Sequence, residues 1–388
     1  MKMVQIAEIV NGITKNVIGE NATILAEDLS NVVAVGAEIE DAIGYDNFTG
    51  QLVDRIGKVV FVDRPLEIDD LGIMKDNWEY GSILEKIAVE PYEAQDNPAW
   101  GLKDGIVVEQ DKVVLPHLVV KFYNDDGTFE IAYTITDEQL RSAFTTPTQL
   151  GSFVGMIENI VRSSMEIRVK EYQRRTINNM TGLTLVDTAM NTGASTKSTA
   201  KVVNLLYLFK QTPQGAETTL TATNCIYDPE FIRFAVSEMD KYVGRMKEPT
   251  KLFNIGKRLR WTPANRLNFI LLDEFLSKAN IYLQSDTFHN EFTRLPKAKT
   301  IAMWQGTGDD FSFENTSKID IKTSSGTAVE VSGILGVMFD TEALGINRYY
   351  EKTTSHRNNH GEYTNFWAKA RMRLFNDTNE NFVVFMVA

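Results

Sequence analysis

The chain has 388 residues and a net charge of −12, from 40 Lys and Arg against 52 Asp and Glu. This acidic balance excludes a protein that coats nucleic acid by simple charge attraction, because such proteins are usually basic. The single cysteine, Cys225, excludes an intrachain disulfide and fits a reducing compartment. No apolar run approaches about 18 residues, and the N-terminal stretch lacks the uninterrupted apolar core of a signal peptide. We therefore expect no membrane partner.

The first 57 residues contain three short helical patterns. Residues 4 to 18 have amphipathic spacing, but Gly12 and Gly19 weaken the helix, which predicts an arm rather than a core element. A second helical pattern covers 28–44, and a third covers 47–57, where Gly57 ends it.

Residues 65 to 112 form a segment rich in Asp, Glu and Gly, after a short apolar strand at 59–62. The segment is too long and polar for a compact loop, yet its spaced aromatic residues do not fit a disordered tail. Strand-like pieces at 83–89 and 106–108 predict a protruding two-stranded arm. Such an arm buries little apolar surface by itself, so we expect its aromatic residues to need a partner surface.

A hairpin is expected next, because β-rich runs at 118–122 and 128–134 flank Asn124-Asp125-Asp126-Gly127. Thr136 and Gln139 then have the spacing of a capping box, which predicts a short helix ending near Phe144.

A long helix is predicted from Thr148 to about Met180, ending before Gly182. About 33 residues at 1.5 Å each give a rod of roughly 50 Å. Its apolar residues recur in steps of three and four, as on one buried face: Leu150, Phe153, Val154, Ile157, Ile160, Val161 and Met165. A second face has charges of alternating sign at Glu158, Arg162, Glu166 and Lys170. We expect the runs at 365–387 and 118–134 to cover the apolar face.

Residues 183 to 340 are expected to form a separate domain in which helices and strands alternate irregularly, which indicates an α+β fold. Helices are predicted at 202–211 and 228–243. Strands are predicted at 225–227, 268–272, 298–304, 319–323, 329–331 and 333–339, and two more runs, 365–375 and 381–387, close the chain.

No stretch has the pattern of a catalytic, cofactor or metal site. The segment 193–198, with Lys197 and Ser198, lacks the glycine spacing of a phosphate loop. His356 and His360 are four apart, but the residues around them are typical of a loop. Cys225 has no adjacent histidine or lysine and is expected to be a buried thiol. The pairs at 125–126 and 309–310 are interpreted as turn aspartates. We therefore expect no enzyme and no cofactor.

The stretch from Arg245 to Arg266 contains seven basic residues and one acidic residue, Glu248. Phe253 and Trp261 lie between the basic residues. Basic residues next to aromatic ones bind phosphates and bases, or pair with an acidic surface on a neighbouring subunit. The net charge of −12 favours a contact with a neighbouring subunit. Contact with DNA and contact with a neighbouring subunit both stay open for residues 251–266.

The order of these parts resembles the major capsid proteins of tailed bacteriophages with the Hong Kong 97 type fold, closest to phi-29-like short-tailed phages. Short blocks at 51–57, 59–60, 136–144, 152–154 with Ile160, 363–367 and 382–385 carry the resemblance. The resemblance implies an N-terminal arm (1–57), an extended loop (58–117), a peripheral domain with a spine helix (118–185), an axial domain (186–339) and a C-terminal return to the peripheral domain (340–388). We expect no counterpart of the immunoglobulin-like domain of those phages after the last strand.

The resemblance also implies the partners. Copies would form pentamers and hexamers of an icosahedral shell, as the virion capsid, after assembly in the host cytoplasm. A separate scaffolding protein and a portal are implied, with weak, non-specific contact to the packaged double-stranded DNA. The alternatives are an encapsulin-like compartment, which shares the fold, and another phage structural protein associated with the tail or portal.

Overall fold

The structure is a computed structural model. It describes residues 3–17, 22–42, 51–52, 71–75, 84–89, 91, 94, 96, 115, 118–123, 125–191, 197–284, 298–307, 318–323 and 326–388. The predicted strands at 59–62 and 106–108, and most of the helical piece at 47–57, lie outside this part of the chain. The described chain divides into two compact units. Unit 1 comprises 1–70, 126–172 and 348–373, and unit 2 comprises 71–125, 173–347 and 374–388.

Unit 1 combines helices with a three-stranded sheet. Its helices are α1 (Met3–Val17), α2 (Val32–Ala42), α4 (Asp137–Ala143) and the first part of α5 (Pro147–Asp187). The strands are β3 (Asp125–Thr136), β11 (Leu344–Asn358) and β12 (Tyr363–Asn376), in the order β11-β12-β3.

Helix α1 belongs to the core of unit 1, which corrects the expectation that it is only an arm. Ile6, Val10 and Ile13 are almost fully buried in one cluster with residues of α4 and α5. The cluster includes Phe144, which packs so closely against α2 that a Cβ at Gly36 would lie 2.7 Å from the Phe144 Cβ. The amphipathic stripe of α1 therefore outweighs its glycines, because burial of apolar area contributes more than helix propensity.

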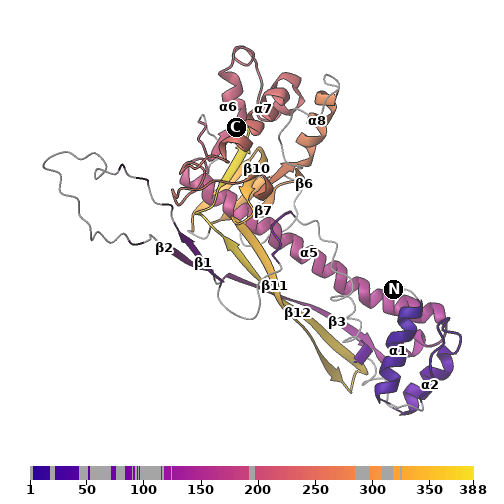
Figure 1. The fold of residues 1–388 in the computed structure, drawn as a ribbon. Coiled ribbons are helices and arrows are strands. Elements are labelled where there is room, and N and C mark those ends of the chain that lie inside the picture. Colours follow the sequence, from indigo (N-terminus) through magenta and orange to yellow (C-terminus); the bar gives the residue numbers. More distant parts are fainter. Residues whose placement is uncertain are drawn as a thin grey trace. The chain divides into compact units, whose positions relative to one another are not determined.

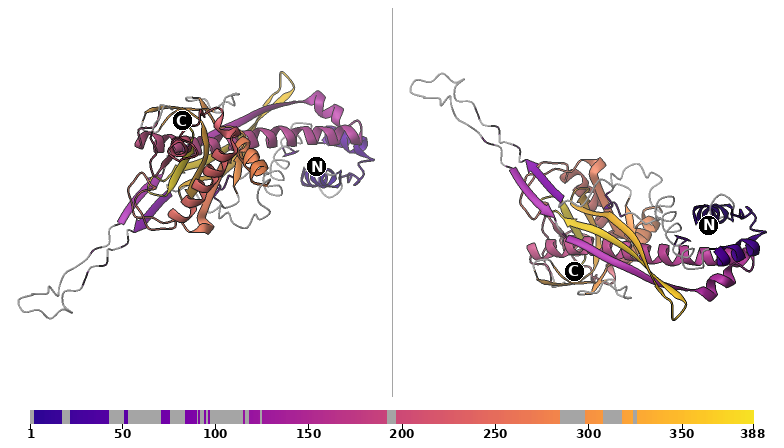
Figure 2. Two further views of the ribbon diagram at one scale, coloured as in Figure 1. Left: turned by 90° about the horizontal axis from the view of Figure 1, so that it is seen from above. Right: turned by 90° about the horizontal axis from the view of Figure 1, so that it is seen from below.

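The apolar face of α5 is confirmed at six of its seven positions. Leu150, Val154, Ile157 and Met165 are almost completely buried, whereas Ile160 remains 37% exposed. The sheet covers this face through Phe129, Ile131 and Tyr133 of β3 and Phe366, Ala368 and Ala370 of β12 (Figures 1 and 2). The side chains of Glu158 and Arg162 lie outside the described part.

Helix α5 has 41 residues and passes through Gly182, where the sequence predicted its end. A Cβ at Gly182 would lie 3.1 Å from Ile321 Cδ1 and 3.2 Å from Thr323 Cγ2. Gly182 therefore lies inside the helix where two side chains approach closely, and it is not a helix stop. The predicted capping box of α4 is confirmed, with Thr136 and Gln139 bonded reciprocally.

The predicted hairpin around residues 124–127 is wrong. Strand β2 (Leu118–Tyr123) pairs with β1 (Leu84–Val89), while β3 is a neighbour of β12. Only Asn124 separates β2 from β3, which leaves no room for a chain reversal. The local Asp-Gly signal is overridden because each strand finds a partner distant in sequence.

Unit 2 is built on a five-stranded sheet of β4 (Val202–Asn204), β13 (Phe382–Met386), β10 (Ile334–Asp340), β5 (Leu267–Leu272) and β6 (Lys299–Ile301), in that order. A second sheet joins β7 (Gln305–Thr307), β8 (Lys318–Lys322) and β9 (Ala328–Ser332). The helices are α6 (Leu205–Lys210), α7 (Pro229–Arg245) and α8 (Asp273–Gln284). Short 3-10 turns cover Cys225–Tyr227 and Ala264–Arg266.

Three expectations for unit 2 need correction. The predicted strand at Cys225 is a 3-10 turn, and the predicted helix at 202 begins with strand β4, because Asn204 caps α6 only after the chain has paired with β13. Strand β13 belongs to this sheet rather than to the cover of α5: Phe382 stacks on Phe339 of β10 at 5.8 Å, directly across the register. Strand β11 and helix α8 were not anticipated.

A buried charge on α5 tests the assignment of its faces. Ile157→Asp should unfold unit 1, because an unpaired carboxylate in an apolar core costs about 4 kcal/mol or more. Ile167→Asp is the matched control on the same helix, since Ile167 is 53% exposed and should tolerate the change. Limited proteolysis and thermal unfolding measure the difference, and equal resistance of the two variants would contradict the assignment.

Candidate assembly site

Strands β1 and β2 form an antiparallel two-stranded ribbon, which confirms the strand expected at 83–89 (Figure 1). Their register places Lys86 opposite Lys121, Ile87 opposite Val120 and Val89 opposite Leu118. Side chains of a strand alternate between two faces, so the ribbon has one face with both lysines and one with the apolar residues. A ribbon of two strands is at best marginally stable alone, so each face needs support.

The lysine face is anchored by one carboxylate, Asp377, in the turn between β12 and β13. Lys86 Nζ lies 2.8 Å from Asp377 Oδ2, and Lys121 Nζ lies 3.2 Å from Asp377 Oδ1. The Asp377 side chain is only 3% exposed. Two like charges placed opposite each other on neighbouring strands repel, and here a shared anion converts that repulsion into attraction to the body of unit 2.

Further contacts complete the anchor. Glu380 Oε1 lies 3.2 Å from Lys86 Nζ and 3.4 Å from Arg260 Nε. Lys86 also donates to the backbone carbonyl of Glu342 at 3.0 Å, and Lys121 donates to Thr378 Oγ1 at 2.7 Å. The lysine face therefore has direct partners at its centre.

The pKa of Asp377 is held below its usual range. Burial alone would raise this pKa, but the charge and hydrogen bond of Lys86, the backbone N–H of Asn379 and the charge of Lys121 together lower it. The carboxylate is therefore ionised throughout the neutral range, as an anchor for two lysines requires.

The apolar face of the ribbon lacks such a cover among the described residues. Ile87 is 59% exposed, Phe122 is 65% exposed and Val120 is 43% exposed. Val89 and Leu118 are also more than half exposed, and Glu85 is the charged residue of this face. A continuous row of exposed apolar side chains is typical of an interaction surface.

Comparison with known proteins gives a family over nearly the whole chain. The model of the Phi29-like phage major capsid protein matches residues 7–386. The chain belongs to the Phi29-like phage major capsid protein family.

Three further likenesses accompany this match. The major capsid protein of Bacillus phage GA-1 is 28% identical over 159 residues, which are 40% of this chain and 31% of that protein. The match thus spans about a third of that relative's length. In fold, the chain resembles the capsid structure of Staphylococcus phage Andhra, with a TM-score of 0.51 and 10% identity over 83% of this chain and 84% of that one. A chain from the structure of head fiber and inner core protein gp22 of bacteriophage P68 has a TM-score of 0.52 and 11% identity, over 83% and 85%.

These comparisons confirm the α+β fold class of the Hong Kong 97 type and the recognised family. Among the described residues, no helix is long and apolar enough to cross a membrane. The same residues include no cluster of three or more potential metal ligands.

The residues considered as sites in this capsid-family chain are scattered. His356 is exposed in β11 and His360 lies in the turn that follows. Burial raises the pKa of the Cys225 thiol to about 11, so it stays protonated and unreactive. Ser198 accepts from the backbone N–H of Asn204, as a structural residue of its loop. Residues 192–196 and 309–310, and the side chains of Asp125 and Asp126, lie outside the described part.

Three arginines of the basic stretch 245–266 make contacts within their own chain. The Arg245 guanidinium lies over the Tyr242 ring at 5.1 Å, Arg260 pairs with Glu380, and Arg266 Nη2 lies 3.4 Å from Asp340 Oδ1. These three arginines are therefore stabilising groups of unit 2. Lys247, Lys251 and Lys257 remain exposed.

The anchor residues Lys86, Lys121 and Asp377 were missed by the sequence analysis. Each lysine lies in the middle of a β-rich run, where no neighbouring residue in the sequence explains the charge. An isolated lysine in such a run was the one sequence feature that could have indicated a distant ion-pair partner. Asp377 follows its partner Lys121 by 256 positions, so no spacing rule could connect them.

Replacement of Asp377 tests the anchor. Asp377→Ala leaves two facing lysines without a shared anion, which costs about 2 to 4 kcal/mol because the pair is mostly buried. Protection of the 84–89 and 118–123 amides in hydrogen exchange should fall. Glu330→Ala is the control, since it removes an exposed pair with Lys318 in the same unit, and exposed pairs contribute little. Unchanged protection after Asp377→Ala would contradict the anchor.

The contribution of Asp377 to the stability of the ribbon depends on pH. The folded pKa of Asp377 is lowered, so its contribution is fully present above the unfolded value of about 3.9. The contribution is lost as pH falls through the lowered folded pKa. Ribbon protection should therefore persist at pH 5 to 7, roughly constant, and decline only in acid below about pH 4. A loss of ribbon protection centred near neutral pH would contradict this assignment.

Proposed function

We propose that this chain is the subunit of the icosahedral shell of a tailed bacteriophage, and that it self-assembles to enclose the double-stranded DNA genome. The match of the family model over residues 7–386 is the observation that carries the proposal. The shell is then the virion capsid, and its assembly takes place in the host cytoplasm.

The two faces of the β1–β2 ribbon support assembly. One face is tied to its own unit by Asp377, and the other exposes Ile87, Val120 and Phe122. An anchored ribbon presents its apolar row without the ordering cost that a loose segment would incur on binding. We propose that a neighbouring copy covers this row, and that residues 58–117 act as the extended loop between copies.

The remaining parts follow from the same proposal. Residues 186–339, with β13 in their sheet, act as the axial domain that builds pentamers and hexamers. Residues 1–57 act as the arm, with α1 packed in the core of unit 1, and 118–185 and 340–376 act as the peripheral domain. A scaffolding protein sets the shell size and a portal replaces one vertex. The acidic subunit makes only weak, non-specific contact with packaged DNA, because like charges repel.

Polar substitution of the apolar row tests the proposed contact. Ile87→Ser with Phe122→Ser should leave the subunit folded, because both side chains are exposed in the single chain. Shell formation should fall by about tenfold or more, since each copy loses apolar contact area on assembly. Glu85→Gln on the same face is the matched control and should assemble normally.

Electron microscopy and sedimentation of protein expressed with its neighbouring genes measure the outcome. Closed shells from the wild type, with few from the double variant, are the expected result. Full assembly of the double variant would contradict the role of the ribbon. A lasting soluble monomer from the wild type would contradict the proposed function itself.

A further inference from the structure

The turn 377–381, which joins β12 to β13, contacts two separate parts of unit 2. Its Asp377 binds the lysine face of the β1–β2 ribbon. The same turn also contacts residues 250–262, which we call the basic loop because they belong to the stretch rich in lysine and arginine. The basic loop exposes two large apolar side chains, Leu252 at 60% and Trp261 at 48%. The turn therefore connects two surfaces that are exposed in the single chain.

Hydrogen bonds link the basic loop to the turn. The Gly256 N–H donates to the backbone carbonyl of Thr378 at 2.8 Å. Asn381 Nδ2 donates to Thr262 Oγ1 at 3.1 Å, and Asn254 Nδ2 donates to Asn381 Oδ1 at 3.4 Å. The three residues of the last two bonds are buried. Because a buried polar atom that loses its partner costs free energy, the loop and the turn stabilise each other in this arrangement.

The packing at Gly256 makes this contact close. A Cβ at this position would lie 2.1 Å from Asn379 Oδ1, which is too short for any side-chain atom. Asn379 in turn donates its N–H to Asp377 Oδ1 at 3.0 Å. The basic loop therefore packs against a residue that orients the anchor carboxylate, and a close-packed interior transmits a displacement from one to the other.

Two residues of the turn bind the ribbon and the basic loop at once. The backbone carbonyl of Thr378 accepts from the loop, while Thr378 Oγ1 accepts from Lys121 Nζ at 2.7 Å. Glu380 Oε1 lies 3.2 Å from Lys86 Nζ of the ribbon and 3.4 Å from Arg260 Nε of the loop. Movement of the ribbon therefore changes the contacts of residues that also hold the loop.

We infer that the turn 377–381 couples the order of the β1–β2 ribbon to the order of the basic loop 250–262. The ribbon, the turn and the loop then open and close as one cooperative part of unit 2. A partner that covers the apolar row of the ribbon also stabilises the loop, and a partner that covers Leu252 and Trp261 stabilises the ribbon, because a coupling free energy is reciprocal. This coupling is a property of the single subunit and goes beyond shell formation.

Hydrogen exchange of the full-length chain, measured before assembly, tests the inference from the side of the loop. Gly256→Ala introduces the Cβ that Asn379 excludes, so the turn has to shift. Exchange of the ribbon amides at 84–89 and 118–123 should become about tenfold faster, although the substitution lies outside the ribbon. Gly244→Ala in α7 is the matched control, since its Cβ would meet no atom within 4 Å, and it should leave ribbon exchange unchanged.

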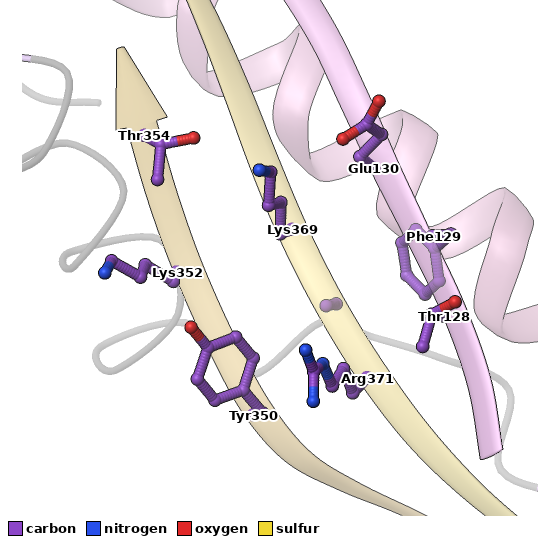
Figure 3. Close-up of a pocket in the computed structure, with 9 residues that line it drawn as sticks. Thr128, Phe129, Glu130, Tyr350, Lys352, Thr354, Lys369 and Arg371 are labelled. Carbon is purple, nitrogen blue, oxygen red and sulfur yellow. The ribbon is translucent and has the colours of Figure 1, made fainter.

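A substitution in the ribbon tests the reverse direction. Lys121→Met keeps the apolar stem but removes the ammonium group that binds the turn. Exchange of the Gly256 amide and its neighbours in 250–262 should become about tenfold faster. Lys369→Met is the control: Lys369 is an exposed lysine of β12 that lines a groove on the β11-β12-β3 sheet (Figure 3), and its loss should leave loop exchange unchanged.

Amides 334–340 of β10 provide the internal reference in both experiments. They should keep their protection, because the coupling concerns one part of unit 2 rather than the stability of its sheet. Loop exchange that is insensitive to Lys121→Met, or equal loss of protection at 334–340, would overturn the inference. If Gly256→Ala does not fold, Lys121→Met decides alone, since the Lys121 side chain is 31% exposed and its loss is tolerated more easily.

Discussion

The carboxylate of Asp377 between Lys86 and Lys121 is the interaction on which the assembly surface depends. A two-stranded ribbon cannot hold its own geometry, and two lysines in register would push its strands apart. One buried anion, within 3.2 Å of both ammonium groups, ties the ribbon to its unit. Because the lysine face contacts its own unit, the apolar row is the face of the ribbon that stays exposed. The two strands on either side of residues 90–117 are held in place by their pairing and by the anchor.

The ribbon therefore has two faces of opposite character, a lysine face that is bound to its own unit and an apolar face that is exposed. In the proposed contact, the apolar row of the ribbon contributes apolar area that a neighbouring copy buries. Each contact can be weak, because a subunit of a closed shell is held by many contacts at once. Charged contacts also exclude wrong pairings, since like charges brought together are costly. This division of roles is consistent with an acidic chain that belongs to a capsid family.

Much of the fold was predictable because its signals are local. The apolar stripe of α5 and the capping box of Thr136 and Gln139 depend on residues within one or two turns, and both are present in the structure. The predictions fail where the interacting residues lie far apart in the sequence. Asp125-Asp126-Gly127 predicts a turn, but β2 and β3 find partners elsewhere. Gly182 lies inside α5, close to Ile321 and Thr323, which are more than a hundred residues later in the sequence. Asp377 likewise has no local signal, because its partners are contributed by β1 and β2. The family could be identified from the order of elements, whereas the site could not.

The most direct test of this account is an electron cryo-microscopy map of the assembled shell at side-chain resolution. In such a map, Lys86 and Lys121 should both contact Asp377 of their own chain, and another copy should cover Ile87, Val120 and Phe122. A map in which the apolar row faces solvent in every copy, or in which Asp377 has released both lysines, would contradict the account.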